Sequence, residues 1–315
     1  MLKKEFLILF AFISSGALAQ SSNSLNFSLG TVNGKAGEYV YIPETGEKVS
    51  YLDWKIKNVP VFILDYTHTR GNIEFQIGLK KNFGSKSSGR MKDYDWYSSD
   101  DLGENGVTPD DYGKLSNFSD NKNYVDNLLM VDTNIKYWFN HTESLKSGPI
   151  LGFKYDYFKF YAKGGNQYDY LLDGSVEVIE GDFSKKSIEY SQDFFTPYVG
   201  YGVSYTYEKL ILNFEIKGSL YGRAKAKDKH LERGPMEDKE KYKNMKNLGV
   251  KFVATYPITP SIDINGTLEY SKYFHKKKST TDFTTEDGEK INGIKDLSGI
   301  KNSSYVVSLG VAYKF

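Results

Sequence analysis

The strongest constraint on this chain is an alternation of apolar and polar side chains with a period of two residues. It is clearest in the last eleven residues, where one face carries Tyr305, Val307, Leu309, Val311, Tyr313 and Phe315. The opposite face is small or polar except for Val306. Successive side chains of a strand point to opposite sides, so this segment predicts a strand with one apolar face. An aromatic carboxyl terminus on such a strand is typical of the closing strand of a bacterial outer-membrane barrel.

The same alternation recurs in segments 131–139, 199–207, 210–220 and 262–270. Taken alone, the last strand also fits the edge of a soluble sandwich. The polar faces of the other segments, however, carry Asp, Glu and Lys as well as neutral residues. Charged faces are unfavourable in a small soluble core but are natural in the polar interior of a barrel.

The amino-terminal residues favour export from the cytoplasm. Lys3 and Lys4 precede an apolar run at 6–13, and a small-residue cleavage site follows at 17–19. This order predicts a signal peptide at 1–19, followed by a single barrel domain at 20–315. After the signal there is no apolar run of about 18 residues, so we expect no membrane-spanning helix. An exported chain without such helices is either soluble or a barrel.

The composition agrees with a barrel. Hydrophobic residues are only 39% of the chain, whereas aromatic residues reach 16% and include 26 Tyr. A barrel needs few apolar residues because only alternate positions meet lipid, and Tyr suits both membrane interfaces. The net charge is +1, and the signal contains two Lys and one Glu, so the mature chain is nearly neutral and nucleic-acid binding is not expected. The absence of Cys excludes disulfides, thiolate metal sites and cysteine nucleophiles.

We expect an all-β fold, a ten-stranded antiparallel transmembrane β-barrel with short periplasmic turns and long extracellular loops. The expected strands are 24–42, 47–69, 71–93, 122–141, 148–170, 187–207, 209–230, 242–256, 261–278 and 299–315. Connections after the second, fourth, sixth and eighth strands are short, and the others after odd-numbered strands from the third onward are long and polar. Several strands exceed the 9–11 residues that cross a bilayer, so the barrel should project beyond the lipid. We look for chemistry on that projecting rim.

Two pairs of titratable residues lie at the expected outer ends of strands. Asp93 and Asp95 end the third strand, and Asp228 and His230 end the seventh. Residues two apart share a face of a strand, so each pair can point into the lumen. An imidazole oriented by a carboxylate can take a proton from water, and a second carboxylate pair can help to bind that water. Without further context, an Asp-x-Asp pair is also common in solvated loops.

No other segment has a recognisable catalytic or cofactor motif. His68, His141 and His275 are isolated and are interpreted as structural or solvated residues. No group of His residues has the spacing of metal ligands, and no phosphate-binding glycine loop or serine nucleophile motif is evident. We therefore expect no metal and no organic cofactor.

The chain resembles the omptins, a family of outer-membrane aspartyl-type endopeptidases with ten-stranded barrels. The matching segments are 27–35, 38–41, 48–55, 91–96, 162–165, 197–198 and the Asp228-x-His230 pair. This resemblance implies that Asp228 and His230 activate water, while Asp93 and Asp95 position and polarise it. It also implies that Glu38 and Met91 contact substrate, and that the active site of this outer-membrane protein faces the outside of the cell.

Two departures from the family concern substrate and lipid. In omptins that cut beside basic residues, an acidic pocket binds Arg or Lys; Glu38 matches one pocket acid, but Ala226 stands at the other. One carboxylate still pairs with a cation, although the double-acid clamp is weakened. Lys227 and Lys229 should point to the opposite face.

The loop expected between Asp93 and Asp126 supports a cationic substrate. It contains nine acidic residues against two Lys. An acidic mouth attracts cationic peptides from a distance, and does so less strongly at high salt. A simpler interpretation is that this loop is only a solvated surface. Peptides or host proteins, some of them cationic, are the expected substrates.

The second departure concerns lipopolysaccharide, on which omptins depend and which they bind through basic residues on the barrel exterior. Two of the family's arginines align with Tyr157 and Asp193, whereas Lys159 and Lys163 lie nearby. Lipopolysaccharide remains an expected partner and activator through the resemblance alone.

Two other functional classes fit the same fold. A barrel of this kind can serve as an adhesin or invasin that binds through its long loops with little proteolysis. A passive pore is also conceivable, but a ten-stranded barrel is narrow and its interior should be filled by Glu, Lys and Asn side chains. The interpretation that we carry forward is an outer-membrane endopeptidase.

Overall fold

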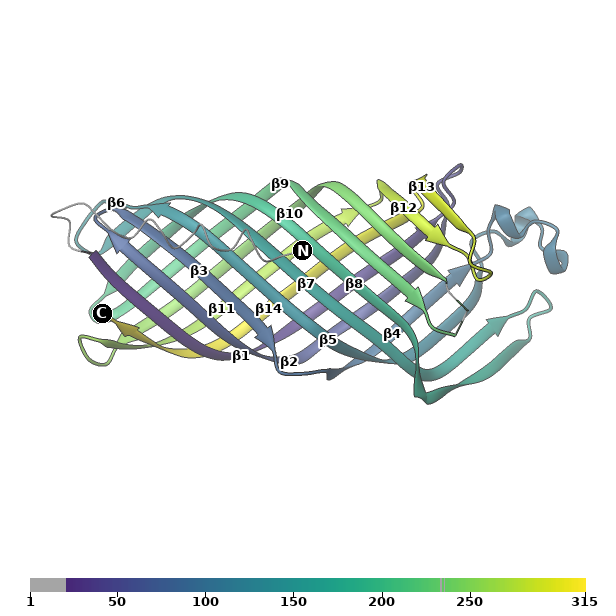
Figure 1. Ribbon diagram of the computed structural model, residues 1–315, viewed down its shortest axis with the longest axis horizontal. Helices are drawn as coiled ribbons and strands as arrows, with labels where there is room; N and C mark the ends of the chain where they lie inside the picture. Colours follow the sequence, from purple (N-terminus) through teal and green to yellow (C-terminus); the bar gives the residue numbers. More distant parts are fainter. Residues whose placement is uncertain (1–20, 233, 235) are drawn as a thin grey trace.

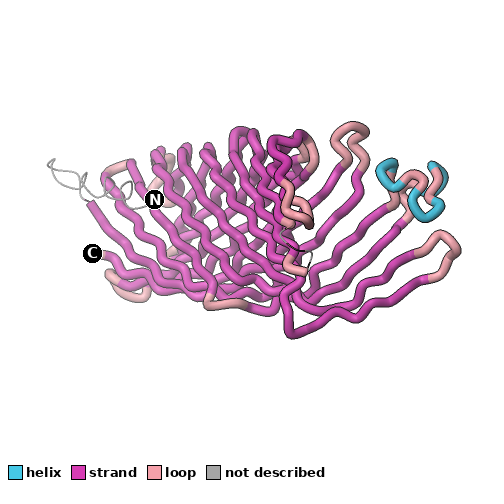
Figure 2. The backbone as a smooth tube through the Cα atoms, turned by 45° about the vertical axis from the view of Figure 1, so that its right-hand side comes forward, coloured by secondary structure: helices cyan, strands magenta, loops and turns pink. Residues whose placement is uncertain are grey.

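The computed structural model describes residues 21–232, 234 and 236–315, so the expected signal peptide lies outside it. The described chain is almost entirely strand, with three short 3₁₀ turns gathered in one connection (Figure 2). The strands are β1 Ser21–Tyr41, β2 Lys48–Arg70, β3 Ile73–Asn82, β4 Lys86–Trp96, β5 Leu115–Tyr137, β6 Phe139–Asn140, β7 Leu145–Tyr170, β8 Val176–Tyr207, β9 Leu210–His230, β10 Glu237–Pro257, β11 Ile262–Lys276, β12 Ser279–Thr284, β13 Lys290–Lys295 and β14 Ser298–Lys314. The 3₁₀ turns are η1 Ser99–Asp101, η2 Glu104–Gly106 and η3 Pro109–Asp111.

The long strands form a closed antiparallel ring, which confirms the expected barrel. Pairing runs from β1 through β2, β3, β5, β7, β8, β9 and β10 to β11, and β14 joins β11 back to β1. Strands β3 and β4 both pair with β2 and β5, so together they occupy one place in a ring of ten. Figure 1 shows the strands tilted steeply across a long cylinder. Within the described part of the chain, no helix is long and apolar enough to cross a membrane.

The boundaries expected for the strands at 71–93 and 122–141 are wrong. The strand expected at 71–93 is interrupted after Asn82, whose side chain bonds to the carbonyl of Gly84 and accepts the backbone N–H of Leu128. In the gap between β3 and β4, the side chain of Asn82 thus replaces backbone hydrogen bonds to the neighbouring strand β5. Strand β5 begins at Leu115 rather than 122, so the residues around Asp120 belong to the sheet and not to an acidic loop.

The projecting end contains more strand than expected. Strand β8 begins at Val176 instead of 187, and it pairs with β7 up to Tyr170 in a long hairpin. Strand β10 begins at Glu237 instead of 242, and the β12–β13 hairpin pairs with it. These segments are rich in charged residues, so their sequences resemble those of loops. Beyond the lipid, a strand needs only hydrogen-bonded neighbours and not an apolar outer face.

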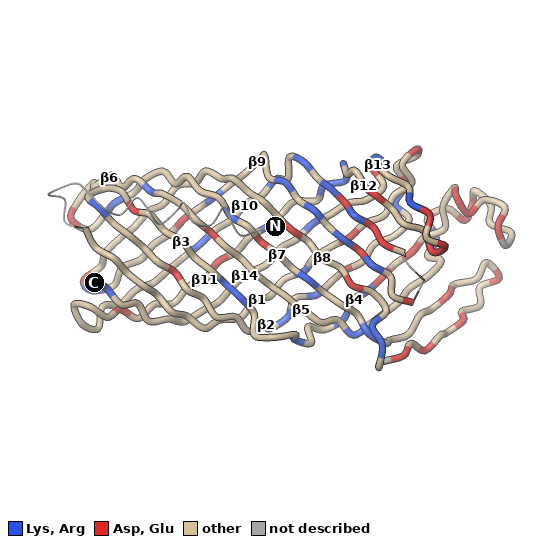
Figure 3. The backbone as a smooth tube through the Cα atoms, viewed as in Figure 1, with Lys and Arg blue, Asp and Glu red and all other residues tan. Residues whose placement is uncertain are grey.

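The outer surface divides the barrel along its length. Around the half that carries the carboxyl terminus, large apolar side chains point outward; Leu309, for example, is 75% exposed. This lipid-facing band includes Phe27, Leu29, Leu151, Val199, Val307 and Leu309. Charged residues instead crowd the end that carries β4, β12 and β13 (Figure 3). The apolar half matches a bilayer, and the charged half projects into water.

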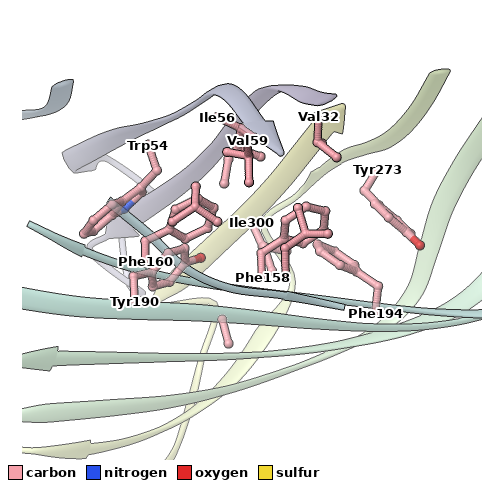
Figure 4. Packing of buried hydrophobic residues seen from close by; sticks show 14 of the residues in the cluster. Val32, Trp54, Ile56, Val59, Phe158, Phe160, Tyr190, Phe194, Tyr273 and Ile300 are labelled. Atoms are coloured by element: carbon pink, nitrogen blue, oxygen red, sulfur yellow. The ribbon is translucent and has the colours of Figure 1, made fainter. Parts of the chain in front are cut away.

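The interior is filled by side chains, of two different kinds. Within the membrane-spanning half it contains ion pairs between Lys and acidic residues from facing strands, which we call the lower lumen pairs. They are Lys80–Glu269, Lys136–Glu215 and Lys217–Asp132. Lys154 and Asp156 add an ion pair within β7. Above them lies an aromatic and aliphatic cluster that includes Trp54, Phe158, Phe160, Tyr190 and Phe194 (Figure 4). This cluster fills the barrel interior below the projecting rim with packed side chains.

Candidate active site

The two residue pairs expected to act together come from strands on different parts of the ring. Asp93 lies on β4, where it is paired with Leu52 of β2 and with Ser119 of β5. The hydroxyl of Ser50 donates a 3.3 Å hydrogen bond to one oxygen of Asp93. Asp95 is paired with Ser50 and Asn117, two residues further along the same face. Neighbouring strands on both sides therefore hold this carboxylate pair.

Asp228 and His230 form a direct contact on β9. Nε2 of His230 lies 2.7 Å from Oδ2 of Asp228. The Asp228 side chain is only 4% exposed, whereas that of His230 is 24% exposed. A carboxylate bound to one ring nitrogen fixes the orientation and tautomer of the imidazole, so the other nitrogen carries the lone pair that can accept a proton. The dyad thus has a buried orienting acid and a base that reaches solvent.

The structure brings one member of each pair to a cleft of about 300 Å³ on the projecting end. Asp93 and His230 line this cleft, and buried Met91 forms part of its wall. Asp95 lies beside it, opposite Asn117, which also lines the cleft. Asp228 is buried behind His230. Asp93 of β4 and His230 of β9 therefore share one cleft, although they are far apart in sequence.

The β7–β8 hairpin supplies a wall of the cleft that was not expected from sequence. Gln167 and Gly165 come from β7, and Glu180 and Asp182 come from β8. Gly165 and Gln167 fall within the expected strand 148–170, whereas Glu180 and Asp182 fall in the segment that was expected to be a long polar loop. The two acidic residues, with Glu232 after β9, give the cleft mouth a negative character.

Glu38 lies on the inner face of β1, next to the dyad. Glu38 is only 3% exposed, and Nε1 of Trp54 donates a 3.3 Å hydrogen bond to its carboxylate. Burial raises the pKa of Glu38 well above its usual value, and the charges of Asp228, Glu240 and Asp238 raise it further. Glu38 is thus part of a group of mutually repelling acids.

Two members of this group, Asp238 and Glu240 of β10, were not identified from the sequence. Asp238 is paired with Asp228 across the β9–β10 ladder, and Glu240 is paired with Ala226. Burial raises the pKa of Asp238 to about 7 and that of Glu240 to about 8, with added repulsion from nearby carboxylates. Their alternation with Lys239 was the available signal, but it fell in a segment expected to be a loop. We call Glu38, Asp228, Asp238 and Glu240 the acid cluster.

The lysines that flank Asp228 point away from the cleft, as predicted. Lys227 and Lys229 are exposed, and Nζ of Lys227 lies 2.6 Å from the carboxylate of Glu237. Ala226, by contrast, is buried on the inner face. The acid cluster and the outer lysines therefore occupy opposite sides of the same sheet.

The exterior residues aligned with lipid-binding positions are engaged with one another. The hydroxyl of Tyr155 donates a 2.6 Å hydrogen bond to Asp193, which is paired with Tyr157 in the ladder. Nζ of Lys159 lies 3.2 Å from Glu189 and 3.6 Å from Asp126. Lys159 therefore has acidic partners within the protein.

The three remaining His residues make local hydrogen bonds. His68 contacts Asn23, His141 contacts Ser147, and Nε2 of His275 lies 2.9 Å from the hydroxyl of Tyr41. Among residues 21–232, 234 and 236–315, no group of three His, Cys, Asp or Glu is arranged to hold a metal ion.

Comparison with known proteins identifies the family of the chain. A model of the omptin family matches residues 19–315. The chain belongs to the omptin family. This chain is 31% identical to the plasminogen activator of Yersinia pestis over 305 residues, which cover 95% of this chain and 91% of that protein. It is 28% identical to protease 7 of Escherichia coli K12 over 319 residues, covering 97% and 95% of the two chains.

The fold comparison gives the same result. The crystal structure of outer membrane protease OmpT from Escherichia coli matches with a TM-score of 0.85 at 24% identity, covering 96% of this chain and 99% of that one. Family and fold together place this omptin among the outer-membrane proteases, which act on peptides or proteins.

Proposed function

We propose that this omptin is an endopeptidase that hydrolyses peptide bonds by means of an activated water, in a cleft that faces the outside of the cell. The observation that supports this most directly is the shared cleft, which is lined by Asp93 from β4 and His230 from β9. A buried Asp228 orients the imidazole from behind. A base, its orienting acid and a separate carboxylate at one cleft are the groups that general acid–base hydrolysis needs.

In the proposed reaction, His230 takes a proton from water as the oxygen attacks the peptide carbonyl. Asp228 stabilises the imidazolium that forms, because its carboxylate lies 2.7 Å from the ring. The imidazolium then gives the proton to the departing amine, which restores the base. Such proton transfer contributes roughly 10²–10⁴ to the rate.

Asp93 and Asp95 would bind and polarise the water from the facing wall. Carboxylates at close range raise one another's pKa, so one of the pair can hold a proton while the other accepts a hydrogen bond from water. Ser50 supports this pair by donating to Asp93. This role makes the enzyme aspartyl-type, because no serine or cysteine nucleophile takes part.

The two halves of the barrel support an outward direction of the cleft. The lipid-facing band surrounds the end that carries the carboxyl terminus, and charged residues crowd the opposite end (Figure 3). The residues that line the cleft belong to this charged end. Chain termini of outer-membrane barrels lie in the periplasm. The charged end would then meet peptides or host proteins outside the cell.

We also propose a preference for basic residues near the cut. Glu38 is buried beside the catalytic dyad, and Glu180 and Glu232 line the cleft mouth. Acidic walls attract cationic peptides, and a buried carboxylate forms a strong pair with a guanidinium. Met91 would contact the substrate through the apolar part of the wall.

Lipopolysaccharide is proposed as a partner on the barrel exterior, with no metal or organic cofactor. Lys159 is engaged with Glu189 and Asp126, so other cations are better placed for lipid phosphates. A groove of about 670 Å³ above the lipid-facing band is lined by Lys35, Lys57 and Lys92. Activity of refolded protein should rise when lipopolysaccharide is added; full activity in plain detergent would exclude this dependence.

The experiment that tests the proposed function uses a quenched peptide that contains Arg-Arg or Lys-Lys. Wild type should cleave it, and Asp93→Ala and His230→Ala should each lose cleavage while keeping the heat-dependent mobility shift of a folded barrel. Equal behaviour of wild type and both variants would favour the alternative function, an adhesin or invasin barrel that binds through its long extracellular hairpins.

A further inference from the structure

The acid cluster has a charge arrangement that differs from the rest of the interior. Glu38 and Glu240 are 3% and 2% exposed, and within the described chain neither they nor Asp238 form an ion pair with Lys or Arg. Buried carboxylates are normally paired with a cation, because an isolated buried charge is costly. The cluster therefore lacks the cation that would make its ionised form favourable.

Strand register explains how Glu240 enters this cluster. Ala226 of β9 is paired with Glu240 of β10 on one side and with Gln192 of β8 on the other. Paired residues of an antiparallel ladder point to the same face, with Cβ atoms about 5 Å apart. A carboxylate at Glu240 can consequently serve the region that an acid at Ala226 would serve, since a Glu side chain is one methylene longer than Asp.

We propose that Glu240 is the second acid of the substrate pocket and that, together with Glu38, it binds the basic side chain of the residue beside the scissile bond. This proposal rests on the proposed peptidase activity. It assigns a specificity role to a residue on a strand that carries none of the expected site residues.

The position of Asp228 connects the pocket to the chemistry. One Asp228 oxygen holds His230, and the other, Oδ1, is buried with no hydrogen-bond partner within the described structure. The charge of Asp228 acts on Glu38, Asp238 and Glu240 alike. A cationic side chain in this pocket would thus lie next to the dyad and would give Asp228 a hydrogen-bond donor.

Aromatic rings surround the same carboxylates. Trp54 donates to Glu38 and stacks on Tyr190 at a centroid distance of 5.7 Å (Figure 4). The hydroxyl of Tyr242 donates to Glu240. Cations bind well against aromatic faces, and a guanidinium also stacks on them, so this wall suits Arg at least as well as Lys.

The competing explanation is that Glu240 is a neutral acid with only a structural role. Burial raises the pKa of Glu240 to about 8, so near pH 7 this carboxyl group is mainly protonated in the free enzyme. A bound cation favours the carboxylate, and the proton is then released. If Glu240 binds substrate, the preference for a basic residue should increase as pH rises from 6 to 9. Glu38 and Asp238 also have raised pKa values, so the contribution of Glu240 is the part of this increase that Glu240→Gln removes. If Glu240 is only structural, the variant keeps the whole increase.

The test compares two peptides that differ only at the residue beside the cut, Arg in one and norleucine in the other. The ratio of their kcat/KM values measures the preference. We expect Glu240→Gln to reduce this ratio at least tenfold and to make its rise with pH smaller, because Glu38 and Asp238 still titrate. The matched control is Glu237→Gln on the outer face of β10, where Glu237 pairs with Lys227 and Lys239; it should leave the ratio unchanged.

A second variant distinguishes a loss of specificity from misfolding. Glu240→Gln combined with Ala226→Asp returns an acid to the facing strand, and it should restore most of the preference for Arg. An unchanged ratio in Glu240→Gln would overturn the inference, even with wild type fully active. Failure of wild type to cleave either peptide would instead overturn the proposed function.

Discussion

The lower lumen and the acid cluster lie in the same barrel, but they differ in whether their buried carboxylates have a cationic partner. In the lower lumen, Glu269 has Lys80 at 2.9 Å and Glu215 has Lys136 at 2.5 Å. In the acid cluster, Glu38 and Glu240 are equally buried, yet the ion-pair partner nearest to this group is His230 on Asp228. In the first region the buried carboxylates have lysine partners within the protein, whereas in our proposal the cationic partner of the second region is the substrate.

This difference separates stability from function along one cylinder. Pairing in the lower lumen holds facing strands together across the interior, so the loss of one partner leaves a buried charge. The acid cluster keeps repelling groups together, and these groups are held by the surrounding sheet. Strained or repelling groups persist where the rest of the fold over-determines them, and they concentrate at functional sites.

The largest expected effect lies at the cleft. His230→Ala and Asp93→Ala should each lower kcat/KM by roughly 10²–10⁴, since each removes a group that acts on the hydrolytic water. Asp93→Ala should not lower the unfolding midpoint in denaturant, because Asp93 lies outside the paired lower lumen. Unfolding measured by Trp fluorescence checks this, and a large loss of stability would remove the distinction between the two regions.

The opposite pattern is expected for Glu269→Gln in the lower lumen. The change leaves Lys80 without its ion-pair partner and should lower the free energy of unfolding by about 3 kcal/mol. Activity per folded molecule should stay the same. The double change Lys80→Met with Glu269→Met removes both charges and should recover most of the loss. Equal activity losses in Glu269→Gln and His230→Ala would contradict the comparison.

The acid cluster should make stability fall as pH rises. Glu240 has a folded pKa of about 8 against an ordinary value of 4.5, so between these values the folded state binds a proton that the unfolded state has released. Each such group lowers the unfolding free energy by up to about 1.4 kcal/mol per pH unit in that window.

Unfolding of wild type and Glu240→Gln between pH 5 and 9 measures this slope. The variant should lose less stability with rising pH than wild type does, because one titrating acid is gone. Asp238, with a pKa of about 7, should still contribute in both proteins. Parallel curves for wild type and variant would show that Glu240 does not titrate in this window.

The smallest expected effect concerns the cleft mouth. Replacing exposed Glu180 and Glu232 by Gln should lower kcat/KM for cationic peptides several-fold at low salt, because long-range attraction is weakened. The difference should disappear near 1 M salt, where the screening length is about 3 Å. Glu143→Gln, at a short turn of the opposite end, is the control and should have no effect at either salt concentration.

The predictable part of the fold came from the period-two pattern. The alternation placed ten strands on the ring correctly, and most boundaries within the lipid-facing half agree to within a few residues. The errors gather at the projecting end, in the β7–β8 extension, the start of β10 and the β12–β13 hairpin. There both faces meet water or other polar groups, so no apolar stripe marks a strand.

The candidate site followed the same division. Spacing of two residues put Asp228 beside His230 and Asp93 beside Asp95 on single faces, and the resemblance supplied their proposed roles. Glu240 could not be recognised in this way, because its importance depends on its place opposite Ala226 on a neighbouring strand. Cross-strand register is set by bulges and connections elsewhere in the sheet.

By itself, the amino-acid sequence determined the all-β barrel, its membrane-facing side and the two short-range residue pairs, because each follows from side-chain direction along a single strand. Only the tertiary structure decided that Asp93 and His230 share a cleft and that the lower carboxylates have lysine partners. It also decided that four upper acids lie together without a lysine partner among the residues that the structure describes. These properties depend on contacts between strands that are distant in sequence, and such contacts are set when the sheet closes into a ring.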